Sequence, residues 1–330
     1  MIRELKDEQG YTATMLIISV LALVFGIAFV FVGELFLPLA SAFLALLFVL
    51  ERPKSRYLSY LAAALPIIIA FLSKGIFGII SLEVVFLSLV IALTYRFNGT
   101  KAECAAYSTL LVASFAALSL YFGGAKAIGS FDINAVFDYY SNVITAFKLR
   151  ILDVINQYVI SRGADASEIF TLTDATELAE QLKMQIVSLL AIVSFILVGI
   201  TLKLFNYAML RVSKRGILKR FAHFLPSNIV SYVYVISVIL SIFSSSQTIA
   251  DAVILNIANI LSVVFAYLGF QYATTIASAS GRRRLAVSLI IISFLMIPAV
   301  ALRLLSFVGV WAAVGINNAM NGKLPPSFDR

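Results

Sequence analysis

Glu83 is the residue whose type and position most clearly suggest chemistry. It lies about eight residues into an apolar run, 75–95, in which it is the only charged residue, so a helix rising about 1.5 Å per residue places it roughly 12 Å inside that run. If the run crosses a membrane, an ionised carboxylate there costs at least about 2–3 kcal/mol unless it is paired or hydrated. We therefore expect Glu83 to contact a ligand or to carry a proton in a cavity. The alternative is a structural ion pair with Lys74 or Arg303.

Asn256 and Asn259 form a second candidate ligand-binding group. They are three residues apart within another apolar run, 252–271, and residues at this spacing share one face of a helix. Amide side chains inside a membrane hydrogen-bond either to a neighbouring helix or to a ligand. The spacing leaves both roles open.

The sequence lacks the residue sets that common enzyme and metal sites need. Cys104 and His223 are the only cysteine and the only histidine, which excludes an intramolecular disulfide and a Cys- or His-based metal cluster. The sequence contains no phosphate-binding glycine loop and no Gly-x-Ser-x-Gly motif. We expect no catalytic residue, no cofactor and no metal. An intramembrane enzyme is the least favoured class, because no Asp, His or Cys accompanies Glu83 in its run.

The composition favours lipid as the solvent for this chain. Of the 330 residues, 61% are hydrophobic and only 13% are charged, whereas soluble domains carry about 25% charged residues. A soluble fold could not bury so much apolar side chain. The net charge of +8 lies in short loops between apolar runs, which is typical of membrane orientation rather than of nucleic-acid binding.

Apolar runs of membrane-spanning length recur along the whole chain. A transmembrane helix needs roughly 17–25 apolar residues, a length that predicts about nine spans here. A tenth run, 304–322, contains two glycines and three asparagines, so we interpret it as a re-entrant or interfacial helix, with a full span as the alternative. The first run lacks a signal-peptide cleavage pattern and is interpreted as a retained span. The nine predicted spans are 11–33, 35–50, 57–73, 75–95, 104–125, 184–202, 227–246, 252–271 and 285–302.

The basic residues predict the topology. Clusters of Lys and Arg follow the second, fourth, sixth and eighth predicted spans, so all four clusters fall on one face of the membrane. The positive-inside rule makes that face cytoplasmic and places the N-terminus on it. We expect the protein in the cell membrane. The clusters are Arg52, Lys54 and Arg56; Arg96 and Lys101; Lys203, Arg211, Lys214, Arg215, Lys219 and Arg220; and Arg282, Arg283 and Arg284.

The long interval 126–183 falls on the extracytoplasmic side. Apolar residues recur three or four positions apart from Val136 to Tyr158, which predicts an amphipathic helix over 135–160. A second helix is expected to begin near Asp174, where Glu177 completes a capping-type start, and to continue into the sixth span. The predicted fold class is therefore all-α, a polytopic transmembrane bundle. Its parts are N-terminal membrane helices 1–125, an amphipathic helical insert 126–183 and C-terminal membrane helices 184–330.

The basic segment 203–222 has apolar residues interleaved with its cations. This pattern predicts a helix in the headgroup region that meets anionic lipid. Positive-inside anchoring explains the same charges without any binding role, and the sequence does not separate the two.

The order of these elements resembles a known family. Residues 221–226 read Phe-Ala-His-Phe-Leu-Pro, and residues 304–311 read Leu-Leu-Ser-Phe-Val-Gly-Val-Trp. Together with the N-terminal helices and the outer insert, these stretches resemble the YybS-like family of predicted bacterial membrane proteins, whose function is unknown. That family is distantly similar to the substrate-binding membrane subunits of energy-coupling-factor transporters. The resemblance implies a small-molecule site near the outer face and partner ATPase and coupling subunits.

Two functions remain open at this point. The first is a transporter-type subunit that binds a small molecule without chemistry, with Glu83 as a polar contact, the helix 135–160 as a cover and an ATPase partner as the energy source. The alternative is a membrane scaffold or regulator, in which the amphipathic helix and the basic segment contact other proteins and Glu83 is structural.

Overall fold

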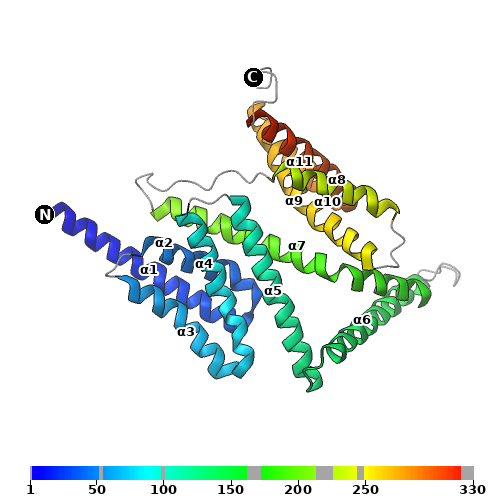
Figure 1. Ribbon diagram of the computed structural model, residues 1–330, viewed down its shortest axis with the longest axis horizontal. Helices are drawn as coiled ribbons and strands as arrows, with labels where there is room; N and C mark the ends of the chain where they lie inside the picture. Colours follow the sequence, from blue (N-terminus) through cyan, green and yellow to red (C-terminus); the bar gives the residue numbers. More distant parts are fainter. Residues whose placement is uncertain are drawn as a thin grey trace. The chain divides into compact units, whose positions relative to one another are not determined.

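The computed structural model describes residues 2–51, 55–97, 101–161, 172–212, 226–243 and 249–320, and all regular structure within these ranges is helical (Figure 1). This confirms the all-α prediction. The N-terminal half contains α1 (Ile2–Val32), η1 (Glu34–Phe36), α2 (Leu37–Leu50), α3 (Arg56–Lys74), η3 (Gly75–Ser81), α4 (Leu82–Arg96) and α5 (Lys101–Ile128). The remainder contains α6 (Ile133–Ser161), α7 (Leu172–Val212), α8 (Asn228–Phe243), α9 (Ile249–Ala279), α10 (Arg283–Met296) and α11 (Pro298–Met320).

The apolar helices fit a multi-pass membrane protein. Within the described residues, six stretches are long and apolar enough to cross a bilayer, and α2 and α8 add shorter apolar helices. Their outward faces are apolar as well: on α1, Leu16, Val20 and Val24 are each more than half exposed, as expected for side chains that face lipid rather than water. The count of nine spans and the extracytoplasmic position of the insert remain predictions. The six stretches are Tyr11–Val32, Arg56–Arg96, Glu103–Ile128, Gln185–Val212, Ala250–Ala279 and Val300–Asn318.

The predicted ninth span, 285–302, does not form one helix. Helix α10 ends at Met296, and α11 begins at Pro298. Ile297 between them has φ −143° and ψ 71°, because a residue before proline is pushed out of the helical region. Proline suits the first turn of α11, where its missing N–H is not needed. The membrane-length helix is therefore α11, and the run 304–320 is its continuation rather than a separate short helix.

The helices predicted for the interval 126–183 are present. Helix α6 covers the predicted range 135–160, and α7 begins two residues before Asp174 and continues without a break to Val212. Residues 162–171 lie outside the described residues, as does the part of the predicted basic segment from 213 onwards. What the structure describes of this interval thus confirms its helical character.

The chain divides into two compact units. The first comprises residues 1–139 and 193–223, and the second comprises residues 140–192 and 224–330. Helices α6 and α7 each contribute residues to both. The boundaries predicted after residues 125 and 183 remain predictions.

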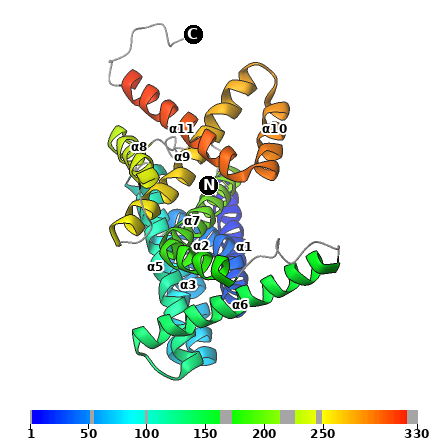
Figure 2. The same ribbon diagram turned by 90° about the vertical axis from the view of Figure 1, so that its right-hand side faces the viewer.

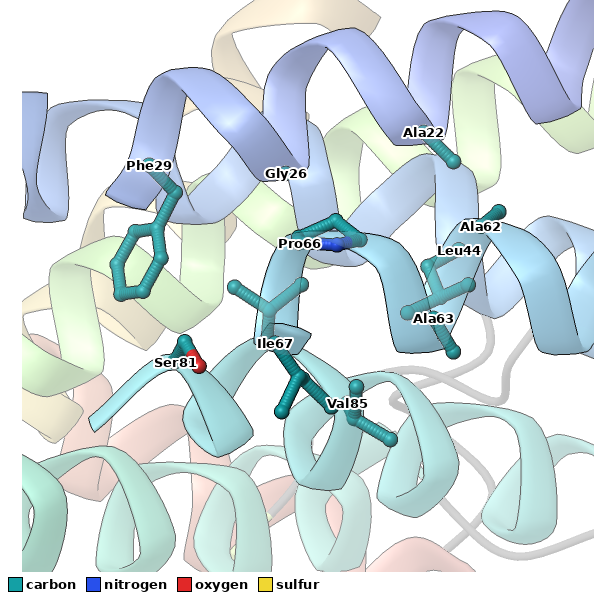
Figure 3. A pocket seen from close by; sticks show the side chains of 11 residues that line it. Ala22, Gly26, Phe29, Leu44, Ala62, Ala63, Pro66, Ile67, Ser81 and Val85 are labelled. Carbon is teal, nitrogen blue, oxygen red and sulfur yellow. The ribbon is translucent and has the colours of Figure 1, made fainter. Parts of the chain in front are cut away.

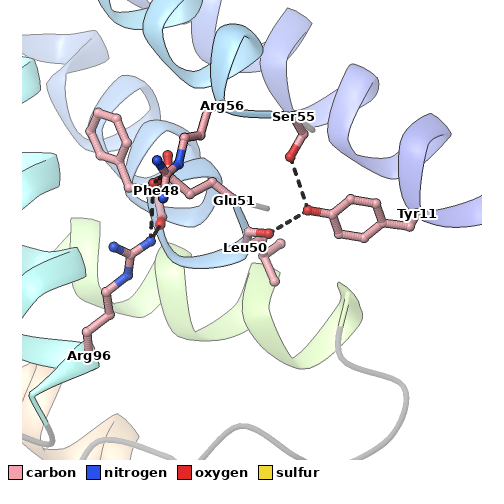
Figure 4. A network of polar contacts seen from close by, with 7 residues as sticks. All are labelled: Tyr11, Phe48, Leu50, Glu51, Ser55, Arg56 and Arg96. Carbon is pink, nitrogen blue, oxygen red and sulfur yellow. Dashed lines mark hydrogen bonds and ion pairs between the residues drawn. The ribbon is translucent and has the colours of Figure 1, made fainter. Parts of the chain in front are cut away.

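In the first unit, successive helices from α1 to α4 alternate in direction, so that α2 and α4 are parallel. Gly26 of α1 lies against Pro66 of α3 so closely that a Cβ at Gly26 would be 2.8 Å from the proline Cγ. At one end of this set, Glu51 lies 3.8 Å from Arg56 Nε and 3.6 Å from Arg96 Nη2 (Figure 4). Tyr11 Oη donates to the Leu50 carbonyl at 2.6 Å. Helix α5 belongs to the same unit, and its residue Cys104 is fully buried.

In the second unit, α9 and α11 cross in direct backbone contact (Figure 2). A Cβ at Gly269 would overlap the Leu305 carbonyl oxygen, and a Cβ at Gly309 would overlap the Phe265 carbonyl oxygen. Glycine at both positions is therefore what lets the helices approach this closely, as in other membrane helix pairs. Helix α8 packs on the pair through the fully buried Tyr234.

Candidate functional site

Helices α2 and α4 run side by side and in the same direction, and this pairing positions Glu83. Ser88 Oγ of α4 is 3.1 Å from the carbonyl oxygen of Ser41 on α2. Further along, Arg96 donates to the carbonyl of Phe48. The same offset, carried back to the start of α4, places Glu83 beside the beginning of α2. Glu34, on η1 immediately before α2, therefore lies at the same end of the unit as Glu83.

Two glycine turns make this arrangement possible. Gly33 has φ 92° and ψ −151°, a conformation essentially restricted to glycine, and it reverses the chain between α1 and η1. Gly75 has φ 59° after α3. The following 3-10 segment η3 packs tightly on α3. A Cβ at Gly78 would be only 2.7 Å from the Ala70 backbone, so glycine is what allows this contact. The chain then enters α4 with Glu83 in its first turn.

Glu83 is completely buried and its carboxyl group has no donor. Its exposed fraction is 0%, and neither Oε1 nor Oε2 has a hydrogen-bond partner among the described residues. Oε2 of Glu34 is likewise buried without a partner. The two carboxyl groups are close enough to repel each other electrostatically. Buried carboxyl groups in folded proteins are normally hydrogen-bonded, so this end of the unit holds an acid pair without the donors that would satisfy it.

The ion pair with Lys74 that was considered from the sequence is not present among the described residues. Lys74 donates instead to the carbonyl of Val30. Arg303 belongs to the second unit, where its carbonyl accepts a hydrogen bond of 2.7 Å from Ser306 Oγ. Sequence reasoning missed Glu34, which ends up as the neighbour of Glu83 although 49 positions separate them.

A small apolar pocket lies next to the turn of α4 that carries Glu83 (Figure 3). Ser81, Val84 and Val85 of this turn line it, opposite side chains from α1, α2 and α3. Its volume of about 10 Å³ is about what one water molecule needs. In this conformation the pocket therefore holds no space for an organic solute.

Asn256 and Asn259 lie in the second unit on α9, so Glu83 and the two asparagines belong to different units. Asn256 Oδ1 accepts from the backbone N–H of Ser188 on α7 at 2.9 Å, and its Nδ2 donates to the Ala252 carbonyl at 2.7 Å. The Asn256 amide thus connects two helices, which is the first of the two roles considered from the sequence, a hydrogen bond to a neighbouring helix rather than to a ligand. Asn259 is half-buried one turn further along α9.

The second unit contains a polar cluster that the sequence did not suggest. Tyr234 Oη of α8 lies 3.2 Å from Ser262 Oγ of α9 and 2.6 Å from Ser306 Oγ of α11. Near the ends of the helices, Asn317 Nδ2 donates to the Pro226 carbonyl at 2.8 Å, and Asn228 Nδ2 donates to Asn318 Oδ1 at 3.2 Å. Asn317 and Asn318, two of the three asparagines on which the re-entrant interpretation of 304–322 rested, therefore connect α11 with the residues at the start of α8, and Asn321 lies outside the described residues.

Basic residues gather at the end of the first unit opposite the acid pair. Arg56 and Arg96 share Glu51 there. Lys101 lies just outside the candidate span Glu103–Ile128. Its pKa is lowered mainly by burial and secondly by repulsion from Lys203 of α7. Three of the clusters that the sequence placed on one face thus have members at one end of this unit.

No protein-family model, curated protein or solved structure matches this chain at a significant level.

Proposed function

We propose that this multi-pass membrane protein is a transporter-type subunit that binds a small polar solute or ion without covalent chemistry, with Glu83 as the polar contact. The observation that carries the proposal is the complete burial of the Glu83 carboxyl group without a hydrogen-bond donor among the described residues. A structural carboxylate in an apolar helix would need such a donor. A group retained without one is typical of a site that acts on a ligand, ion or proton.

The proposal extends to topology and partners. The end of the first unit that carries Glu51, Arg56, Arg96 and Lys101 faces the cytoplasm of the cell under the positive-inside rule, and the N-terminus lies on that side. The acid pair then lies toward the outer face. An ATPase and coupling subunits supply the energy, as in the transporters that the YybS-like family resembles. We infer membership of that family from residues 221–226 and 304–311.

One observation favours the alternative, a membrane scaffold or regulator. The pocket beside Glu83 has a volume of only about 10 Å³, so a solute larger than water requires the helices around it to move apart. In a scaffold the pocket would stay closed, and the amphipathic face of α6, where Phe137, Phe147 and Val154 are each more than half exposed, would bind another protein.

Native mass spectrometry of the protein, purified gently from its own cells, tests the two functions. A bound small molecule, or co-purified ATPase and coupling subunits, is the result expected for a transporter subunit. The same preparation of Glu83→Gln should retain less of the bound molecule, whereas Asn256→Gln serves as the matched control and should retain it. A ligand-free chain that carries an unrelated protein would contradict the proposal in favour of the scaffold.

A further inference from the structure

We propose that Glu34 and Glu83 form a carboxyl pair that takes up one exchangeable proton, so that any transport through the first unit is linked to proton binding. This inference rests on the proposed function in placing the ligand site at Glu83, and it deepens that function by naming the proton as a ligand.

The first step is that the two carboxyl groups act as one site. Glu34 ends the Gly33 turn, and Glu83 occupies the first turn of α4. Ser88 fixes α4 against α2 through the Ser41 carbonyl, so the pair is held by the parallel packing of two helices rather than by flexible loops. The same offset of α4 against α2, carried back from Ser88 to Glu83, brings the Glu83 carboxyl group to the beginning of α2, next to Glu34.

The second step is that the pair is not satisfied by protein groups. Three carboxyl oxygens, both of Glu83 and Oε2 of Glu34, are buried without a hydrogen-bond partner among the described residues. Two neighbouring carboxylates in an apolar setting cannot both remain ionised, because desolvation and mutual repulsion act together. One proton removes one of the two charges and turns an acceptor into an O–H donor for the other carboxyl group.

The third step is that cations on the surrounding elements have other contacts. Lys74, at the end of α3, donates to the Val30 carbonyl. Lys126 of α5 lies 5.6 Å above the ring of Phe77 on η3. Helix α2 carries no titratable side chain between Leu37 and Leu50. The other charged groups on the described parts of α3, α4, α5 and the α2–α3 connection lie at the opposite end of the unit: Glu51, Arg56, Arg96, Lys101 and Glu103.

The fourth step concerns exchange with the surroundings. Glu83 is fully buried, whereas Glu34 is only half-buried although its Oε2 is enclosed. A proton arriving from water therefore meets Glu34 first. Its transfer breaks the O–H bond on Glu34 and forms one on Glu83, and the pair keeps a net charge of one throughout the transfer. Glu34 is then the entry group and Glu83 the inner acceptor.

Carbodiimide labelling tests the pair in the full-length protein without any solute. Dicyclohexylcarbodiimide is apolar and reacts with protonated carboxyl groups: the carboxyl O–H adds across a C=N bond, and rearrangement leaves a stable N-acylurea. We expect intact-mass and peptide analysis to locate this adduct on Glu83, with a rate that falls as the pH rises. In Glu34→Gln the fall should occur at a proton concentration at least tenfold higher, that is, at least about one pH unit lower. The reason is that the neighbouring negative charge, which favours protonation of Glu83, is gone.

The controls separate this result from general reactivity. Glu51→Gln removes a carboxylate that is already paired with Arg56 and Arg96, so it should leave both the rate and the pH profile of Glu83 labelling unchanged. The pH profile of the unmodified chain needs no variant and stays informative even if Glu34→Gln folds poorly.

Three results would overturn the proposal. They are an absence of adduct on Glu83, a Glu83 profile that does not move in a folded Glu34→Gln protein, and protection of Glu83 by sodium but not by choline at equal ionic strength, since sodium would then be the occupant. If Glu83 labels as expected while native mass spectrometry finds no solute, the solute-binding function fails and the proton site stands.

Discussion

Glu83 in the first unit and Asn256 in the second are both polar side chains within apolar helices, yet their surroundings differ. The oxygen of the Asn256 amide accepts a hydrogen bond from α7, and its nitrogen donates one to a carbonyl of its own helix. The Glu83 carboxyl group is more deeply buried and has no donor among the described residues. The difference shows that depth in an apolar run does not by itself determine whether a polar side chain is hydrogen-bonded. What matters is whether the neighbouring helices supply hydrogen-bond partners.

The largest effect is expected where the second unit depends on close backbone contact. In Gly309→Ala the added Cβ overlaps the Phe265 carbonyl oxygen, so α9 and α11 must separate and Tyr234 loses its serine partners. We expect a loss of about 2–3 kcal/mol in the free energy of unfolding, measured by denaturant unfolding in micelles. Gly315→Ala is the matched control, because nothing lies within 4 Å of a Cβ there. Equal effects of the two substitutions would show that the crossing is not tight.

Glu83 and Asn256 should respond differently to substitution. Asn256→Leu removes the contact with Ser188 and should lower the free energy of unfolding by about 1 kcal/mol, typical of polar contacts between membrane helices. Glu83→Gln removes a potential buried charge without removing a hydrogen bond to any described residue, so stability should stay level or rise. Thermal unfolding of both variants at neutral pH measures the two changes in stability. A larger loss in Glu83→Gln than in Asn256→Leu would mean that Glu83 has a structural partner.

A smaller effect is expected at the tyrosine of the second unit. Tyr234→Phe keeps the ring contact with Phe265, at a centroid distance of 5.1 Å, and removes the hydroxyl shared with Ser262 and Ser306. Ser306 still donates to the Arg303 carbonyl. The expected loss is about 0.5–1 kcal/mol, read from the same denaturant curves. A neutral result would show that the hydroxyl contributes nothing beyond packing.

The smallest effect concerns Lys101, whose contribution to stability depends on pH. Its pKa in the folded chain is lowered by burial and by Lys203, so the protonated form opposes folding at every pH below the ordinary lysine value. Lys101→Gln should therefore raise the unfolding temperature slightly at pH 7, and the gain should shrink as the pH rises toward the ordinary lysine pKa of about 10 and vanish above it. Lys126→Gln, which removes a cation stacked on Phe77, should give no such gain.

Long helices were predictable because their signals are local. The apolar spacing from Val136 to Tyr158 predicted α6, and the uninterrupted pattern after Asp174 predicted the continuous α7. The break before Pro298 was also visible in the sequence. It was missed because the run 285–302 was judged by its hydrophobicity alone, although proline disfavours a helical residue before it.

The candidate site was only half predictable. Burial within an apolar run pointed to Glu83, but Glu34 becomes its neighbour only through the parallel packing of α2 on α4, which no local pattern encodes. Tyr234, Ser262 and Ser306 meet for the same reason, across three helices. The glycines that allow α9 and α11 to touch, Gly269 and Gly309, were present as a signal, since small residues mark close helix contacts in membranes.

Because Cys104 is buried, the unsubstituted chain can serve as the unlabelled control in a thiol-labelling experiment. Cys104 is the only cysteine of the protein, and its exposed fraction is 0%, so a membrane-impermeant maleimide added to intact cells has no native target on the folded chain. A single cysteine introduced at Lys74 and another at Arg56, the two ends of α3, can then report sidedness directly. The Lys74 position should be labelled from outside, and the Arg56 position only after the membrane is opened.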